Sequence, residues 1–360
     1  MPIAASLLAA AAAALYGARA VPAASVSACP EVYRLGGGDP SSETLDILVL
    51  PDGFTAEQLP VFRCAVSRMF DGLGAMEPFR RIASSLRIYR IDQAAPSEGI
   101  EVPAGCPASA TGDFTPFTRT PEAAPFLAAC AGVPTGEPVF AEGAYCATCT
   151  NADLRFFHDP AISPDCRVLW TDGEGLRRIW RYTRCAPDVD AIVVVANSIA
   201  HAGGGTADAH PPVSVVTLSE ITSPSTAGRL LGHEFGHALG LLDEYALGTG
   251  EVPEFQSGRN VVKKLPDGTI ETPPWADRCE NLDGSKASSC ITIQGTTCTA
   301  NPPPVQTMPK VGLFEGAFYQ ACGYFKASDR CLLDQEAKYC AGCRVYLEKL
   351  FRDLGLPSAP

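Results

Sequence analysis

The sequence predicts a mixed fold of helices and strands, α/β (α+β), with a mostly parallel twisted sheet. One helix carries the reactive residues, and a smaller, loop-rich part of the chain follows it. Three stretches predict this fold. Residues 45–91 have the pattern strand–helix–strand, residues 191–196 are a continuous apolar run, and residues 213–218 alternate before another helix. Parallel strands need a long crossover, usually a helix, and the interior strands of parallel sheets are apolar on both faces.

The first unit begins with residues 45–50 (L-D-I-L-V-L), which predict a buried strand, and a turn at residues 51–54 follows. Residues 55–58 (T-A-E-Q) have the spacing of a helix cap, and apolar residues then recur at helical intervals as far as Phe70. Residues 86–91 predict a second strand. We expect the two strands to be parallel and joined by a crossover helix.

Residues 92–165 interrupt this pattern and predict a loop-rich insertion, because Pro, Gly, Ala and Cys dominate and no periodicity persists. We expect disulfides to hold the insertion together. Its candidate cysteines are Cys106, Cys130, Cys146, Cys149 and Cys166. Regular structure resumes with a helix predicted near residues 173–183, followed by the strands at residues 191–196 and 213–218.

The rest of the chain predicts less regular structure. Residues 203–205 are all glycine, and they either border a sheet edge on which an extended ligand can lie or form a flexible loop. The region after Tyr245 is irregular, with two helices predicted near residues 312–319 and 343–354.

The most informative stretch is residues 232–245, G-H-E-F-G-H-A-L-G-L-L-D-E-Y. It contains H-E-x-x-H, in which His233 and His237 lie about one helical turn apart on the same face. Two imidazoles so placed can bind one zinc ion. Glu234, beside the first histidine, can reach a water on the metal without being a ligand, as a general base must.

Asp243 is the predicted third ligand. A catalytic zinc site needs three protein ligands and an exchangeable water, but in an uninterrupted helix Asp243 would lie roughly 9 Å beyond His237. Gly240 removes this difficulty, since glycine readily adopts the left-handed conformation that ends helices. The pattern H-E-x-x-H-x-x-G-x-x-D is the metzincin signature with aspartate as its last ligand. The alternative is a chance match on an ordinary amphipathic helix.

Composition and the N-terminal residues predict a globular, exported protein. The chain has 360 residues, 46% hydrophobic and 19% charged, and its formal net charge of -12 argues against nucleic acid or an anionic membrane as a partner. Residues 1–20 have the apolar run and A-R-A ending of a secretion signal but lack a basic start, and a disordered leader or a membrane anchor is the alternative. No later stretch is long and apolar enough to cross a bilayer.

The predicted mature chain starts with an N-terminal extension at residues 21–43, a tether or an addition to a sheet edge that Cys29 can pin. Fifteen cysteines agree with a secreted or periplasmic location. Because the count is odd, at least one cysteine is unpaired or a ligand. The C-x-x-C pairs at residues 146–149 and 340–343 can build a four-thiolate zinc site, but in an exported chain we favour disulfides for them.

The chain resembles the IgA-peptidase family of zinc metallopeptidases, a metzincin-like group. The residues that carry the resemblance are 47–55 (I-L-V-L-P-D-G-F-T), 77–80 (E-P-F-R), 233–245 and 314–317 (F-E-G-A). The zinc segment is highly specific, and the other three segments support it. Together they extend over residues 44–345, although the Cys-rich stretches between them match poorly.

The resemblance implies a metzincin-type fold and zinc-dependent hydrolysis of peptide bonds. Together with the predicted secretion signal, it leads us to expect a secreted zinc endopeptidase that acts on protein or peptide substrates. It assigns one catalytic Zn²⁺ to His233, His237 and Asp243, with Glu234 as the general base. Members of the family place a methionine in a turn beneath the metal, where this chain has residues 331–333 (C-L-L). Leucine offers a similar apolar floor. Nothing in the motifs identifies the peptide sequence that is cleaved.

One catalytic domain is predicted over residues 44–355. Its upper subdomain is residues 44–240, with the insertion at residues 92–165, and its lower subdomain is residues 241–355. A cleft between the two would pass over the ion.

Four further residues have candidate roles near the metal. Tyr319 or Tyr324 can donate a hydrogen bond to an oxyanion, with core packing as the alternative for each. Glu244 and Tyr245 are expected to orient a ligand or to close the turn.

Two other interpretations of the motif stay open. The chain can be a secreted binding or adhesion module with a structural zinc, although such sites usually have four protein ligands and no use for Glu234. It can also be a thermolysin-like enzyme, in which the third ligand is a glutamate on a later helix. His201 and His210 are candidates for additional ligands, with solvent-facing loop positions as the alternative.

Overall fold

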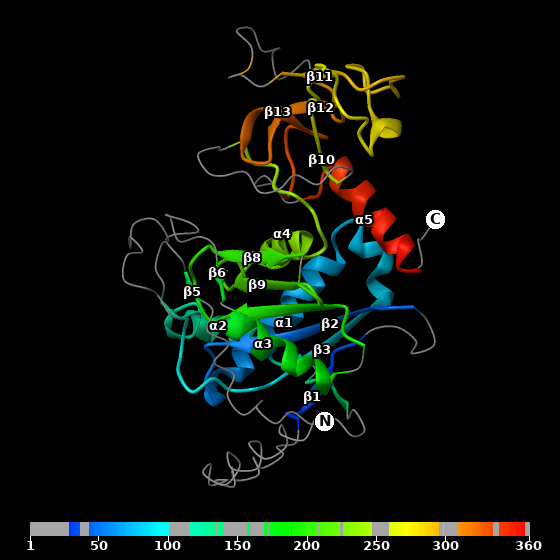
Figure 1. Ribbon diagram of the computed structural model, residues 1–360. Helices are drawn as coiled ribbons and strands as arrows, with labels where there is room; N and C mark the ends of the chain where they lie inside the picture. Colours follow the sequence, from blue (N-terminus) through cyan, green and yellow to red (C-terminus); the bar gives the residue numbers. More distant parts are fainter. Residues whose placement is uncertain are drawn as a thin grey trace, which may run out of the picture.

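The computed structural model describes residues 29–36, 43–100, 115–133, 135–139, 157–158, 169–171, 173–186, 188–207, 209–223, 226–246, 259–294, 298, 308–333 and 338–356. Over these residues the protein is a mixed α/β structure with one seven-stranded sheet, one four-stranded sheet and one two-stranded pair (Figure 1). The predicted secretion signal and Cys106, Cys146, Cys149 and Cys166 lie outside the described residues.

The seven-stranded sheet has the order β4-β1-β3-β2-β7-β9-β8 among the described strands. Its strands are β1 (Val32–Arg34), β2 (Leu45–Asp52), β3 (Leu86–Ile91), β4 (Glu137–Val139), β7 (Ala191–Ala196), β8 (Gly203–Thr206) and β9 (Val213–Thr217). The four central strands β3, β2, β7 and β9 are parallel, which confirms the predicted parallel pair β2–β3. The outer pairings are antiparallel, so the sheet is mixed rather than mostly parallel.

The antiparallel strands escaped the sequence analysis because they are short and lack an apolar run: V-Y-R, E-P-V and G-G-G-T. β1 falls within the predicted N-terminal extension and pairs with β3 and β4. Within this extension, Cys29 forms a disulfide with Cys185. Of the two alternatives for the extension, addition to the sheet is therefore the one observed, and the disulfide confirms that Cys29 pins it.

Helices cover both faces of this sheet (Figure 1). They are α1 (Leu59–Gly74), α2 (Ala123–Ala128), α3 (Gly173–Tyr182), α4 (Arg229–Ala238) and α5 (Ala341–Asp353). Alternate side chains of a strand point to opposite faces. Ile47 and Val193 accordingly share a core cluster with α1, α4 and α5, whereas Leu48 and Val194 share another with α3. The helices predicted near residues 173–183 and 343–354 are confirmed as α3 and α5.

Short 3-10 helices and a two-stranded pair fill connections between these elements. The 3-10 helices are Ala56–Gln58, Phe79–Ser85, Phe117–Arg119, Thr183–Cys185 and Ala276–Arg278, and the two-stranded pair is β5 (Phe157–His158) with β6 (Leu169–Trp170). The predicted cap before α1 is present, since the Thr55 N–H donates to Oε1 of Gln58 at 3.0 Å.

The part of the chain after α4 contains a four-stranded sheet where mainly irregular structure is predicted. Its order is β10-β13-β12-β11, with β10 (Val261–Lys263), β11 (Thr292–Ile293), β12 (Leu313–Ala317) and β13 (Gln320–Lys326). Figure 1 shows it at the end of the molecule away from β1, with α5 running from it towards the larger sheet. Trp275 and Phe325 belong to the same core cluster as Ile47, so apolar packing is continuous between the two sheets.

The helix predicted near residues 312–319 is wrong, because this stretch is β12 and the turn into β13. Gly316 has a φ of 106°, and Phe318 and Tyr319 have φ of 51° and 60°. These values are incompatible with a right-handed helix. Positive φ at both central residues is instead what a tight two-residue hairpin turn needs. The short apolar run had no feature that separates a strand from a helix.

Four disulfides join described residues, namely Cys29–Cys185, Cys64–Cys130, Cys279–Cys290 and Cys298–Cys322. The prediction that a disulfide of Cys130 holds the insertion is confirmed. Its partner is Cys64 on α1, so the bond ties the insertion to that helix. Across the described ranges, no helix combines the length and apolar character needed to cross a membrane.

Candidate metal centre

The helix α4 carries the H-E-x-x-H residues and ends at the glycine turn that the sequence predicts. Phe235 is fully buried and anchors the helix in the core. Gly240 has a φ of 97°, and its N–H donates to the carbonyl oxygen of His237 at 2.8 Å. The next N–H, of Leu241, donates to the carbonyl oxygen of Gly236 at 2.9 Å. This pair of bonds is the Schellman termination of a helix, which turns the chain back on itself.

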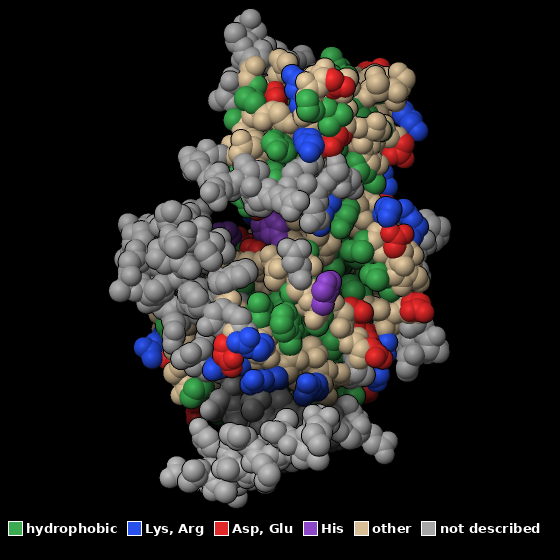
Figure 2. Space-filling model, viewed as in Figure 1, with side chains coloured by type: hydrophobic (Ala, Val, Ile, Leu, Met, Phe, Trp, Pro, Cys, Tyr) green, Lys and Arg blue, Asp and Glu red, His purple; other side chains and the backbone are tan. Residues whose placement is uncertain are grey.

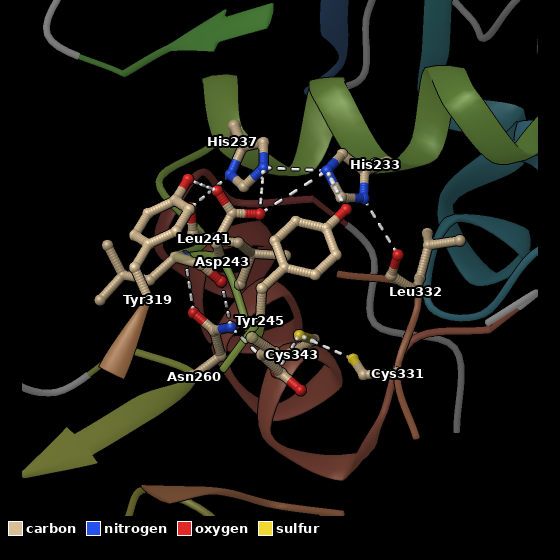
Figure 3. A network of polar contacts seen from close by, with 12 residues as sticks. His233, His237, Leu241, Asp243, Tyr245, Asn260, Tyr319, Cys331, Leu332 and Cys343 are labelled. Atoms are coloured by element: carbon tan, nitrogen blue, oxygen red, sulfur yellow. Dashed lines mark hydrogen bonds and ion pairs between the residues drawn. The ribbon is translucent and has the colours of Figure 1, made fainter. Parts of the chain in front are cut away.

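Backbone carbonyls orient both imidazoles (Figure 3). The Nδ1 atom of His233 lies 3.0 Å from the carbonyl oxygen of Leu332, and that of His237 lies 3.0 Å from the carbonyl oxygen of Leu241. Because a carbonyl only accepts, each Nδ1 carries the donated proton, and each Nε2 keeps a lone pair in the neutral ring. The two Nε2 atoms lie 3.2 Å apart.

The chain reversal at Gly240 brings the Asp243 carboxylate to both imidazoles. Its Oδ1 lies 3.1 Å from Nε2 of His237 and 3.7 Å from Nε2 of His233. The three side chains are only 13–15% exposed. Within the described part of the chain, the buried Oδ1 accepts no hydrogen bond of normal geometry. Three atoms able to ligate one cation therefore face one another.

Burial and neighbouring charges shift the pKa values of these three groups, and the directions favour positive charge near Asp243. Burial lowers the pKa of His233 to about 4, and the nearby His237 adds to this effect. For His237 burial also acts to lower the pKa, but the negative charge of Asp243 outweighs it and raises the pKa to about 9. Burial acts to raise the pKa of Asp243, yet the positive charge of His237 holds that pKa below its usual value.

Glu234 is buried next to β8, beside the two histidines. Burial raises the pKa of its carboxyl to about 8. Carboxylate and imidazole ligand atoms of Glu234, His233 and His237 all lie within 4.8 Å of one another. A carboxyl group with a pKa near neutrality is suited to accept and return a proton.

The glycines of β8 are required by this close packing. A Cβ at Gly203 would clash with the carboxylate of Glu234, and a Cβ at Gly205 would clash with the backbone carbonyl oxygen of Glu234. The flexible-loop alternative for residues 203–205 is therefore wrong. They form an edge strand of the described sheet, antiparallel to β9.

Tyr319 reaches Asp243 from the turn between β12 and β13. Its hydroxyl donates to Oδ2 of Asp243. The turn is also bonded to the Asp243 loop through the backbone, since Phe318 N–H donates to the Asp243 carbonyl at 3.0 Å and Tyr319 N–H to the Tyr245 carbonyl at 2.8 Å. Positive φ is rare for aromatic residues and occurs mainly where function or surrounding structure demands it.

The other two candidate tyrosines have different positions. Tyr324 packs against the ring of Phe318, with ring centroids 5.6 Å apart. Tyr245 faces the centre, with its hydroxyl 3.5 Å from Nε2 of His233 (Figure 3). Of the two tyrosines that the sequence analysis names as possible oxyanion donors, Tyr319 and Tyr324, only Tyr319 therefore contacts a residue of the candidate centre.

Glu244 does not orient a ligand of this centre, because its side chain points into a separate buried group. Its Oε1 lies 3.2 Å from Sγ of Cys340 and 3.1 Å from Sγ of Cys343. Both cysteines are free and buried, so the disulfides that the sequence analysis favours for this C-x-x-C pair are not formed. Cys340 and Cys343, at the start of α5, both place Sγ against Oε1 of Glu244.

The remaining sequence candidates lie around the centre or outside it. Leu332 and Leu333 are buried, and a Cβ at Gly232 of α4 would lie 3.0 Å from Leu332. The expected apolar floor is thus in place.

His201 and His210 are exposed and belong to none of the possible ligand groups among the described residues. Figure 2 shows histidine side chains in a recess at the level of α4.

Comparison with known proteins adds no assignment. The chain matches no protein-family model, and none of the curated proteins matches it significantly.

Proposed function

We propose that this protein is an exported zinc-dependent endopeptidase with a metzincin-like catalytic domain. The observation that supports this most strongly is the approach of Oδ1 of Asp243 to Nε2 of both His233 and His237, with Glu234 beside them. Two imidazoles and one carboxylate are a ligand set of catalytic zinc sites, which keep a fourth position open.

The residues present fit a bound zinc ion. Nδ1 of each ring faces a carbonyl oxygen, so Nε2 of His233, and Nε2 of His237 once that ring is neutral, are available to a metal ion together with Oδ1 of Asp243, which lies 3.1–3.7 Å from them. His233, His237 and Asp243 would hold the ion. When bound there, zinc supplies a Lewis acid and lowers the pKa of a water to about 7.

The protein's own groups carry the proton transfers. Glu234 accepts the proton of the attacking water and passes it to the leaving amine. Its buried position on α4, against β8, keeps it close to the histidines, and its pKa of about 8 places both protonation states within reach at neutral pH. Tyr319 anchors Oδ2 of Asp243, so that Oδ1 stays turned to the imidazoles.

The edge strand β8 supports a protein or peptide substrate. Edge strands present unpaired backbone groups to which an extended peptide can add. β8 is the outermost described strand on its side of the sheet and packs directly against Glu234. A peptide added there would pass next to the candidate centre. The four disulfides among described residues support export to an oxidising compartment.

The rival functions have less support. A thermolysin-like enzyme needs a glutamate from a later helix, whereas Asp243 from the loop after α4 already meets both imidazoles. A binding module with a structural zinc would have a closed set of four ligands and no reason to bury Glu234 beside them.

A casein digest tests the proposed function. We expect the purified chain to cleave casein, to lose this activity with a chelator, and to regain it with Zn²⁺. Glu234→Gln should keep its zinc but lose activity by about 10²–10⁴-fold, the range for removal of a general base. Glu122→Gln is the matched control. Glu122 is exposed and lies far from Glu234 in the sequence, so this variant should cleave casein at the wild-type rate. Undiminished hydrolysis by Glu234→Gln would reject this base, and no hydrolysis by the zinc-loaded wild type would favour the binding module.

A further inference from the structure

A second group of potential ligands lies beside the candidate centre. Glu244, Cys331, Cys340 and Cys343 are all buried and offer ligand atoms that lie within 4.8 Å of one another. None of these residues takes part in the proposed hydrolysis. The three cysteines are thiols, although eight other cysteines in the described residues form disulfides.

The four groups are arranged around one point. Sγ of Cys331 lies 3.4 Å from Sγ of Cys343, and Oε1 of Glu244 lies 3.2 Å and 3.1 Å from the sulfurs of Cys340 and Cys343. A tetrahedral zinc site with Zn–S of about 2.3 Å has neighbouring ligand atoms about 3.5–3.8 Å apart. The three separations given above are within a few tenths of an ångström of that range, and the other pairs in the group lie no more than 4.8 Å apart.

The surroundings favour negatively charged ligands. Cys340 caps the N-terminus of α5 and Cys343 lies in its first turn, where the helix dipole stabilises thiolates. The Cys340 N–H also lies 3.2 Å from Sγ of Cys331 and donates to it. The buried Lys326 ammonium donates to the Glu244 carbonyl oxygen at 3.0 Å, and so brings a positive charge close by.

We propose that Glu244, Cys331, Cys340 and Cys343 bind a second, structural zinc ion. Three thiolates and a carboxylate close a tetrahedral set without leaving an open position, which is typical of structural rather than catalytic sites. A carboxyl group and three thiols buried together without a cation would be costly, because burial of polar groups is favourable only when they are paired. The divalent ion supplies the missing charge.

A disulfide explains the cluster less completely. A bond between Cys331 and Cys343 would use the closest pair of sulfurs but leave Cys340 as a single thiol against Glu244. Among the described residues, the buried carboxylate would then rely on the hydrogen bond from Nδ2 of Asn260 to Oε1, at 3.0 Å, and on the charge of the nearby Lys326. Only a cation uses all four groups.

This site would connect the two segments that position the candidate catalytic residues. Glu244 lies between Asp243 and Tyr245, and its N–H donates to the Leu333 carbonyl oxygen at 3.2 Å. Cys331 precedes Leu332, whose carbonyl oxygen orients His233. A structural ion would thus fix the loop after α4 to the apolar floor beneath it and to the start of α5.

Metal analysis of the full chain tests this site. The protein is purified with Zn²⁺, mild reductant and no chelator, and its zinc content is measured by mass spectrometry. We expect about two zinc ions per wild-type chain and about one in both His233→Ala/His237→Ala and Cys340→Ser/Cys343→Ser. In the histidine double variant, replacement of zinc by Co²⁺ should give the intense thiolate-to-cobalt absorption in the near ultraviolet.

The histidine variant keeps the test valid even if the cysteine variant does not fold. Its retained zinc together with the thiolate absorption would support the second site. Loss of all zinc from this variant, or a Cys331–Cys343 disulfide in a non-reduced peptide map of the wild type, would overturn it. Because the two sites are counted separately, one ion in the wild type and one in the histidine variant would uphold the thiolate site while rejecting the proposed catalytic ion.

Discussion

Backbone carbonyls decide how the two histidines face Asp243. The carbonyl oxygens of Leu332 and Leu241 accept from Nδ1 of His233 and His237, so both Nε2 atoms point inward. The H-E-x-x-H motif identifies the two imidazoles, and the spacing of the glycine and the aspartate identifies the third ligand. The carbonyl groups that orient the imidazoles could not be predicted from the sequence, because every residue has a carbonyl group and only the fold determines which ones lie next to the histidines.

The choice between Tyr319 and Tyr324 also depended on the fold. Both lie in one hairpin, and the sequence offers no reason to prefer either. The positive φ of Tyr319 places its side chain on the far side of the turn, against Asp243, while Tyr324 stays on β13 beside Phe318.

Tyr319→Phe should weaken the candidate centre without unfolding the protein. It removes the hydrogen bond to Oδ2 of Asp243, and loss of such an outer partner of a ligand typically costs 10–100-fold in metal affinity or activity, so an effect of about that size is expected. Zinc affinity by competition with a chromogenic chelator and the casein rate are the measurements. Tyr324→Phe is the matched control, and an equal loss in both variants would contradict the role given to Tyr319.

At the scale of elements, the long apolar strands were predictable and the short ones were not. β7 is an unbroken apolar run and β2 contains the apolar run I-L-V-L, so both predict buried strands, and both are buried along their full length. β8 and β12 depend on neighbours instead. β8 contains three glycines and pairs because β9 lies beside it, and β12 is a five-residue strand that its hairpin defines.

The packing of β8 on α4 explains why its glycines matter for chemistry. Only backbone can lie this close to Glu234, as the clashes of an added Cβ at Gly203 and Gly205 show. Gly203 and Gly205 differ in which neighbouring atoms an added Cβ would displace. At Gly203 it is the flexible end of the Glu234 side chain, and at Gly205 it is the rigid helix backbone.

Alanine substitutions should separate these two effects. Gly203→Ala should fold and keep its zinc but lose casein hydrolysis by at least about 10-fold, because the displaced Glu234 carboxylate no longer meets the water. Gly205→Ala should lower the melting temperature instead, since overpacking against backbone costs about 1–3 kcal/mol. Melting curves and casein rates of both variants are the measurements. Full activity in Gly203→Ala would show that Glu234 does not need its present position.

At the scale of the molecule, the candidate centre lies where the two parts of the chain meet. α4 belongs to the layer that covers the seven-stranded sheet, whereas Tyr319 and the floor at residues 331–333 come from the part after Gly240. The sequence analysis sets the boundary between the two predicted subdomains at Gly240. It missed the four-stranded sheet that delivers Tyr319, because the irregular composition of that part hid its short strands.

The charge balance of the whole centre predicts how zinc binding depends on pH. The pKa of His237 is about 9 in the protein without a bound ion, so at lower pH the ion must displace one proton from this ring. Apparent zinc affinity of the chelator-stripped chain should therefore rise about tenfold per pH unit from about pH 5 to 8 and level off above about pH 9. Below about pH 4 the proton on His233 adds a second unit of slope.

Asp243→Asn provides the control for this pH profile. The charge of Asp243 is what raises the pKa of His237 against the effect of burial. Its removal should shift the plateau of zinc affinity to lower pH, besides weakening binding. Titration calorimetry at several pH values measures both effects, and an affinity independent of pH in the wild type would contradict the assigned ligands.

The central claim is that one hydrolytic ion lies between two imidazoles of α4 and the carboxylate that the glycine turn returns to them. X-ray diffraction from zinc-loaded crystals, with anomalous data on both sides of the zinc edge, tests it most directly. The account predicts an anomalous peak about 2.0–2.2 Å from Nε2 of His233, Nε2 of His237 and an oxygen of Asp243, with Glu234 outside the ligand shell. Zinc density elsewhere, with these three side chains unligated, would contradict it.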